Sequence, residues 1–173
     1  TSVYGVLGAI GTERLRRFVG FMILSSIGTI LVAISMNNTE AWAGALYYMV
    51  HSTLIAAAFY VLCGWITSQR GVFKDHFKLA PKMKQQTLVS IVYFIIALMI
   101  AGLPPFSGFF GKVMILQATA NSPHQILIIV TLLVVSLLSI IGLVRVGFVL
   151  FWRATPPETN TESDDYHTYQ ALP

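Results

Sequence analysis

The sequence predicts an all-α protein, a polytopic transmembrane helical bundle with one discontinuous helix. Of its 173 residues, 55% are hydrophobic and only 10% are charged, and the mean hydropathy is +0.73. A soluble globular domain usually carries about 25% charged residues. The apolar residues also gather in stretches of about 20 residues, the length that a helix needs to cross about 30 Å of hydrocarbon. These observations exclude an ordinary soluble domain.

The expected membrane-spanning elements follow residue 12, at about 15–36, 41–68, 87–120 and 123–152. The first ends at the turn-forming pair Asn37 and Asn38, and the second is long enough to cross at a tilt. The third is interrupted over 103–108, where two prolines and a glycine occur. The fourth opens with a serine, a proline and a glutamine, in the order expected for an N-cap, a first helical position and a capping box. Residues 1–11 are interpreted as the end of a helix whose beginning is missing.

The basic residues predict how the bundle is oriented, because Lys and Arg in short loops favour the cytoplasmic side. They gather at 12–17, at 69–86 and after the fourth stretch, whereas the loops 37–40 and 121–122 contain none. All of them share one side if the interrupted third stretch crosses once. Two crossings there would leave arms of about 15 residues, which is short for a bilayer. We therefore expect a multi-pass protein of the cell inner (plasma) membrane, with the loops 12–17 and 69–86 and the tail 153–173 in the cytoplasm.

Several other functions have no support in the sequence. The formal net charge of +4 is a weak sign of nucleic-acid binding, because the basic residues lie in short loops between apolar runs. Cys63 is the only cysteine, so neither an intrachain disulfide nor a cysteine-based metal site can form. No Gly-rich phosphate loop, metal-ligand spacing or nucleophile elbow occurs. The sequence therefore predicts no cofactor, no metal site and no soluble-enzyme chemistry.

Lys112 is the strongest candidate for a functional residue. It lies roughly midway along the third apolar stretch, and a charge at bilayer depth costs several kcal/mol unless it is hydrated or paired. A lysine near a helix end could instead extend its amine to the lipid headgroups, but Lys112 does not lie at the edge of the stretch. Removal from water disfavours a charged amine, so a membrane lysine can alternate between charged and neutral forms. A proton relay requires that chemistry.

The interruption beside Lys112 gives it a structural setting. Pro104 and Pro105 remove backbone donors and clash with the preceding turn, and Ser107 and Gly108 follow after Phe106. Broken membrane helices are tolerated where they line a wet cavity or the protein interior, and their ends offer polar groups to ions. A simple kink that aids packing is the alternative. A break and a lysine within two turns of each other favour the functional interpretation.

His51 is the second candidate, because histidine can accept and release a proton near neutral pH. A hydrogen-bonded packing histidine is an equally open alternative. Ser25 and Ser26, in the first stretch, are expected to satisfy interhelical hydrogen bonds, although hydroxyl groups can also hold water in a proton wire. No Asp or Glu falls within a predicted span, so a carboxylate partner for a charged Lys112 must come from elsewhere.

Three segments resemble the antiporter-like subunits shared by Mrp-type cation/proton antiporters and respiratory NADH dehydrogenase (complex I). Residues 14–28, RLRRFVGFMILSSIG, are similar to that family's helix-entry motif KRLLAYSS, with Phe21 where tyrosine is usual. Residues 50–59, VHSTLIAAAF, resemble its HxxxxAxLF helix, with Ile55 where some complex I subunits have a lysine. Residues 103–112, LPPFSGFFGK, resemble its broken-helix motif. The double proline with the terminal lysine and the His-Ser-Thr-Leu run are most similar to the D-type subunits of Mrp antiporters.

The resemblance covers nearly all of residues 1–152 and implies a partial antiporter-like domain, the C-terminal half of that fold, followed by a polar linker at 153–173. In that family two inverted five-helix units each contain a discontinuous helix, and protons are thought to move along a central line of lysines, histidines and a glutamate. By resemblance, Lys112 is the terminal lysine of the second unit and His51 belongs to the central line. The first unit, with its expected glutamate and lysine, is absent.

The function implied by the resemblance is that of a proton-translocating subunit of a multisubunit Na+ (or K+)/H+ antiporter, a secondary transporter and not an enzyme. Its expected partners are the other subunits of the complex, protons, Na+ or K+, and the lipid bilayer, but not nucleic acid. A related alternative is a proton-pumping membrane subunit of NADH:quinone oxidoreductase or of a related hydrogenase. A structural membrane scaffold is an alternative of another class, and it predicts that an apolar residue can replace Lys112 without loss of transport.

Overall fold

The computed structural model describes residues 1–70, 77, 85–120 and 123–152. These residues form α1 (Ser2–Gly11), α2 (Leu15–Ser35), α3 (Thr39–Gln69), α4 (Gln86–Ala101), α5 (Ser107–Ala118), α6 (Gln125–Gly147) and the π-helix η2 (Phe148–Trp152). The all-helical fold class is confirmed. Most of the loop expected at 69–86 and all of the tail at 153–173 lie outside the described residues.

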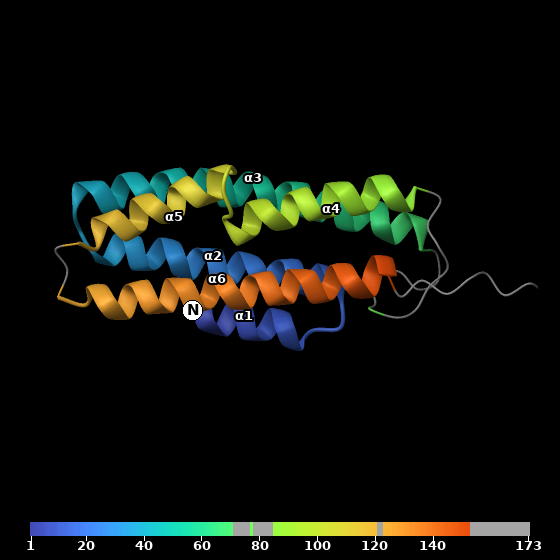
Figure 1. The fold of residues 1–173 in the computed structure, drawn as a ribbon, viewed down its shortest axis with the longest axis horizontal. Coiled ribbons are helices and arrows are strands. Elements are labelled where there is room, and N and C mark those ends of the chain that lie inside the picture. Colours follow the sequence, from blue (N-terminus) through green and yellow to red (C-terminus); the bar gives the residue numbers. More distant parts are fainter. Residues whose placement is uncertain (71–76, 78–84, 121–122, 153–173) are drawn as a thin grey trace, which may run out of the picture.

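The helices lie side by side along the long axis of a bundle (Figure 1). α2 and α3 run in opposite directions, and α4 and α5 follow one another in the same direction along α3. α6 then returns in the opposite direction and contacts α4, while the short α1 packs against both α2 and α6. A single long helix, α3, therefore contacts the helices on both sides of the break between α4 and α5.

Among the described residues, three helical segments are long and apolar enough to cross a membrane, namely Leu15–Ser35, Thr39–Gln69 and Gln125–Trp152. The predicted discontinuous helix is also confirmed, because α4 ends at Ala101 and α5 begins at Ser107. The start of α6 differs slightly from the expected one. The Ile128 N–H donates to the carbonyl of His124 at 3.1 Å, which places the first helical residue at Gln125. The serine expected to cap this helix lies outside the described residues.

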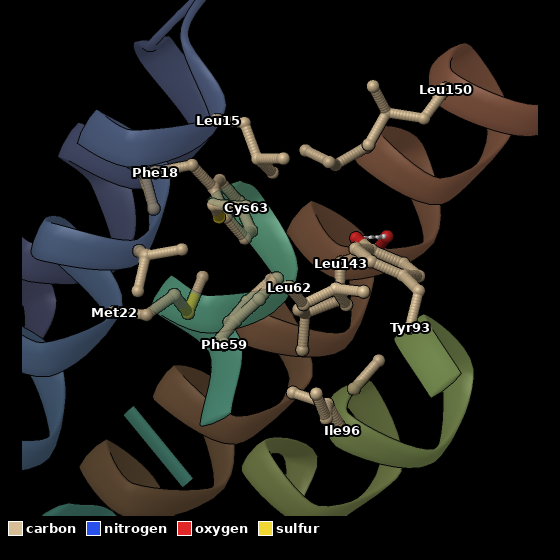
Figure 2. Close-up of a cluster of buried hydrophobic side chains, with 14 of the residues drawn as sticks. Leu15, Phe18, Met22, Phe59, Leu62, Cys63, Tyr93, Ile96, Leu143 and Leu150 are labelled. Atoms are coloured by element: carbon tan, nitrogen blue, oxygen red, sulfur yellow. Dashed lines mark hydrogen bonds between the residues drawn. The ribbon is translucent and has the colours of Figure 1, made fainter. Parts of the chain in front are cut away.

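The buried apolar side chains form two clusters. The larger, which we call the aromatic cluster, includes Phe18, Phe59, Tyr93 and Phe151. Figure 2 shows much of it enclosed by α2, α3, α4 and α6. The smaller cluster comprises Ala33, Ala45, Tyr48, Ile115 and Leu132. Its members lie near the end of α2, near the start of α3, within α5 and in the first half of α6, so the two clusters occupy opposite ends of the bundle.

Polar side chains lie along the helices between these two clusters. They are Ser26 on α2, His51 on α3, Ser107 and Lys112 on α5, and Ser136 on α6, and we refer to them as the polar layer. Apolar packing at both ends therefore brackets the helix break and the polar groups around it.

Candidate functional site

The break between α4 and α5 begins with a left-handed turn at Gly102. This residue has φ 74° and ψ 44°, a conformation that glycine adopts without steric cost. The N–H of Gly102 donates to the carbonyl of Met99 at 3.2 Å, and the N–H of Leu103 donates to the carbonyl of Leu98 at 3.3 Å. This hydrogen-bond pair is a Schellman motif, which closes the C-terminus of a helix. The turn therefore ends α4 inside the bundle.

The prolines that follow leave main-chain acceptors of α4 without helical donors. In a continuous helix the N–H of residue i donates to the carbonyl of residue i−4. Pro104 and Pro105 have no N–H, so the carbonyls of Ile100 and Ala101 lack their usual partners. An acceptor buried without a donor costs about 1–3 kcal/mol. The break therefore creates a demand for donors in the middle of the membrane-spanning region.

Lys112 satisfies part of this demand. Its amine, Nζ, donates to the carbonyl of Ala101 at 2.8 Å and to Oγ of Ser136 at 3.1 Å. A positive charge at the C-terminal end of a helix is also favoured by the helix dipole. The amine of Lys112, on α5, is thus held between the end of α4 and the middle of α6, in the interior of the bundle.

Gly102 also makes room for the lysine side chain. A Cβ atom at this position would lie 2.9 Å from Cδ and 3.0 Å from Nζ of Lys112. Any other residue would therefore strain the main chain and press on the lysine at the same time. The same glycine that ends α4 fixes the path along which Lys112 reaches Ala101.

His51 lies on the α3 side of the same break. Its Nδ1 is 2.8 Å from Oγ of Ser107, the first residue of α5. The ring also interacts with the backbone of Met99 and lies within electrostatic range of Lys112. Gly108 is buried next to this ring. The structure therefore brings together the two predicted proton-carrying residues, although no direct hydrogen bond between them occurs among the described residues.

A groove of about 670 Å³ opens beside His51. Its lining is mostly apolar and comprises Leu46, Tyr47, Val50, His51, Leu54, Ile55, Ala58, Met99 and Ser107. The His51–Ser107 pair is the polar part of this lining. His51 is partly buried and lies at the edge of this groove.

The two predicted serines have different environments. Ser26 hydrogen-bonds with the carbonyl of Met22 at 3.2 Å, and its side chain interacts with that of Tyr48. The ring of Tyr48 lies 5.9 Å from that of His51, so Ser26 is linked to the site. Ser25 is buried at the α1 side of α2, where its backbone lies against Gly5. Adjacent helical residues point about 100° apart, so Ser25 and Ser26 face different neighbours.

Two members of this arrangement were not predicted as site residues. Tyr48 lies two residues before the segment 50–59, and Ser136 is a small polar residue in the most apolar of the three described candidate membrane spans. The presence of a hydroxyl group in such an apolar helix is the sequence feature that could have identified Ser136 as a site residue. Within the described ranges, no group of three or more His, Cys, Asp or Glu side chains gathers in a way that could hold a metal ion.

Comparison with known proteins places this geometry in a family. Residues 1–139 match the family NADH:quinone oxidoreductase/Mrp antiporter, TM. The D subunit of the Na(+)/H(+) antiporter of Bacillus subtilis is 28% identical over 172 residues, which cover 99% of this chain and 34% of that protein. The D subunit of the Na(+)/H(+) antiporter of Alkalihalophilus pseudofirmus is 30% identical over 152 residues, 88% of this chain and 30% of that protein.

A solved structure contains a chain with a similar fold. A chain in the structure of the Mrp complex from Dietzia sp. DQ12-45-1b is similar with a TM-score of 0.80 and 28% identity, over 90% of this chain and 29% of that chain. This chain spans about a third of the length of the curated relatives it matches. The family match extends over most of the chain and includes the helix break, His51, Lys112 and Ser136. The chain belongs to the NADH:quinone oxidoreductase/Mrp antiporter family of membrane proteins.

Proposed function

We propose that this chain forms the proton-handling part of a D-type subunit in a multisubunit Na+ (or K+)/H+ antiporter. Lys112 carries the proton, and the observation that supports this role most directly is the placement of its amine between Ala101 and Ser136. No described residue forms an ion pair that would hold Lys112 permanently charged. Its partners are neutral acceptors, so the charged and the neutral amine can both be accommodated.

The two states of the amine have different requirements. The ammonium form has three donors and no acceptor, and it supplies the donor that Pro105 cannot give to the carbonyl of Ala101. The neutral amine keeps two donors and gains an acceptor, so it can still bond Ala101 and can accept a hydrogen bond from the Ser136 hydroxyl. When the proton is released, the hydrogen bonds around Lys112 therefore reorient, but the carbonyl of Ala101 still has a donor.

His51 passes the proton onward in this proposal. Its ring contacts Ser107, the first residue of α5, and both side chains line the groove. The interaction of Tyr48 with Ser26 continues the polar layer toward α2. Water admitted at the helix break joins Lys112 to His51, because backbone that is not helical is tolerated at membrane depth where it lines a wet cavity.

The relatives suggest the ions and partners. Two proteins similar to this chain are named as D subunits of Na(+)/H(+) antiporters, and the similar solved structure is of an Mrp complex. By this similarity the chain acts as part of a transporter that assembles from several antiporter subunits and serves protons and Na+ or K+. We also propose that the turn at 12–17 faces the cytoplasm, because its arginines follow the distribution of basic loop residues in membrane proteins.

A second function is compatible with the family, whose description also includes NADH:quinone oxidoreductase. In that case the same proton path would be driven by redox chemistry in other subunits. The driving force separates the two functions. Proton flux in response to a Na+ or K+ gradient alone supports the antiporter, whereas flux that requires NADH and a quinone supports the oxidoreductase.

The test is a measurement of cation-dependent proton flux in vesicles that carry the full-length complex. We compare the wild type with Lys112→Ala at matched subunit abundance, with Arg17→Ala as a control that removes an exposed charge at the start of α2. The proposal predicts that Lys112→Ala assembles and loses flux while Arg17→Ala retains it. Unchanged flux in Lys112→Ala would overturn the proton-carrying role and favour a structural scaffold.

A further inference from the structure

The helices α4 and α6 are connected at two levels. At one level Lys112 bonds Ala101 of α4 and Ser136 of α6. At the other level the hydroxyl of Tyr93, on α4, donates to the carbonyl of Leu143, on α6, at 2.8 Å. Figure 2 shows this second bond within the aromatic cluster.

The two levels have matching spacings along the helices. Ala101 follows Tyr93 by eight residues, which is about 12 Å of helix, and Leu143 follows Ser136 by seven residues, which is about 10.5 Å. The helices run in opposite directions (Figure 1). A bond between Tyr93 and Leu143 therefore places Ser136 at the level of Ala101, where Lys112 reaches both.

The surroundings of Tyr93 leave its hydroxyl little freedom. The side chain is fully buried, and its ring packs edge to face with Phe59 and Phe151 at centroid distances of 5.7 and 5.4 Å. A Cβ at Gly147 would lie 2.9 Å from Cε1 of Tyr93, so the ring fits against the bare backbone of α6. A buried hydroxyl without a partner is costly. If α6 slid along α4, Tyr93 would lose its acceptor.

The segment of α6 beside Tyr93 is also where the helix changes type. The hydroxyl interacts with the backbone of Gly147, the last α-helical residue, and the π-helix η2 follows directly. The side chain of Gln86, at the start of α4, donates to the carbonyl of Phe151 in η2 at 2.6 Å. π-helical turns are rare and occur frequently at functional sites. α4 thus holds both the end of α6 and the π-helix that follows.

We propose that Tyr93 is a positioning residue that sets the register of α6 against α4 and thereby keeps Ser136 within reach of Lys112. The proposal rests on the proton-carrying role of Lys112 given above. Tyr93 touches neither the proton nor the polar layer, and it acts through the backbone of α6. Its contribution is to fix the hydrogen-bond partners of the lysine, and with them the pH range in which the lysine exchanges its proton.

The test compares Tyr93→Phe with Tyr60→Phe in the full-length complex. Phenylalanine keeps the ring packing and removes only the hydroxyl, and Tyr60 is a 43% exposed tyrosine on α3. The readout is the pH profile of cation-dependent proton flux per assembled complex. Loss of one hydrogen bond is expected to change, by about fivefold, the ratio of molecules with α6 in the correct register against α4 to molecules with α6 out of it. We therefore expect a shifted profile in Tyr93→Phe and an unshifted one in Tyr60→Phe.

A double-mutant cycle with Ser136→Ala shows whether Tyr93 acts through Ser136. If it does, Tyr93→Phe shifts the profile in the wild-type background and adds little in the Ser136→Ala background. Equal shifts in both backgrounds, or a loss of thermal stability with an unchanged profile, would overturn the proposal. Should Tyr93→Phe fail to assemble, Gly147→Ala displaces the same ring while keeping the hydroxyl. The same shift is expected there, and an unshifted profile in that variant would again overturn the proposal.

The outcomes also separate this proposal from the function on which it rests. Retained flux in Lys112→Ala would remove the proton-carrying role itself, whatever the result at Tyr93. Lost flux in Lys112→Ala with an unshifted profile in Tyr93→Phe would leave the proposed function in place and contradict only the positioning role.

Discussion

The aromatic cluster and the polar layer satisfy their buried polar groups in different ways. In the aromatic cluster the hydroxyl of Tyr93 bonds a main-chain carbonyl, and aromatic rings fill the space around it. In the polar layer a comparable carbonyl, that of Ala101, is bonded by the amine of Lys112. A phenol bound in this way stays protonated under ordinary conditions, whereas an amine can release its proton. With the function proposed above, the bundle separates a region that supplies stability from a region that handles protons.

A mutation in the aromatic cluster is expected to have the largest effect on stability. Phe59 is fully buried and contacts the rings of Phe18 and Tyr93. Its truncation in Phe59→Ala removes these contacts and should cost about 3–5 kcal/mol. The measurement is the thermal unfolding midpoint of the purified complex, with Leu54→Ala, an exposed position, as the control.

The comparison predicts that Phe59→Ala lowers the midpoint and, because Phe59 packs against Tyr93, shifts the pH profile of flux, while the maximal flux per assembled complex stays near the wild-type value. A variant of normal stability that has lost its maximal flux would show that the aromatic cluster does more than position α6, and the separation of the two regions would be wrong.

Gly102→Ala is expected to lower both the stability of the bundle and the proton flux, with a smaller loss of stability than in Phe59→Ala. A residue other than glycine with φ near 74° costs about 1–3 kcal/mol, and the added Cβ would press on Lys112. We expect a lower unfolding midpoint together with reduced proton flux. Gly64→Ala is the matched control, because no atom lies within 4 Å of a Cβ at that glycine. Normal flux in Gly102→Ala would mean that the position of the lysine amine is less important than we propose.

His51→Ala tests the second proton-carrying residue and is expected to have the smallest effect on stability. Proton transfer by a positioned side chain contributes at least about a hundredfold in enzymes, but water at the break can replace part of this path. We therefore expect flux to fall by about tenfold, less than in Lys112→Ala. The control is His124→Ala, an exposed histidine at the end of the bundle. Equal flux in the two histidine variants would assign His51 to packing alone.

The sequence was sufficient to predict the parts of this arrangement that depend on local chemistry. A charge in an apolar stretch identifies Lys112, and two consecutive prolines identify the break, without knowledge of any neighbour. The partners of these residues depend on how the helices pack. Ser136 becomes a partner of Lys112 only through the register of α6 against α4, and Ser25 and Ser26 separate only when α1 and α3 take their places on either side of α2.

The role of Tyr93, in the aromatic cluster, also depends on helix packing and could not be predicted from the sequence. An aromatic residue in an apolar stretch is most often a packing residue, and nothing local indicates that its hydroxyl reaches the backbone of a helix 50 residues away in sequence. Single-residue patterns therefore indicate where a proton is held in the proposed function. The fold determines which groups hold it there.

The most direct test of the central claim is Lys112→Arg in the full-length complex. Arginine keeps the positive charge and the donors for Ala101 and Ser136, but it does not release its proton in proteins. The measurement is cation-dependent proton flux at matched subunit abundance, next to the wild type and Lys112→Ala. If Lys112 carries the proton, the arginine variant assembles and transports no better than the alanine variant. Flux near the wild-type level would contradict the account, because it would mean that the residue acts only as a fixed charge at the end of α4.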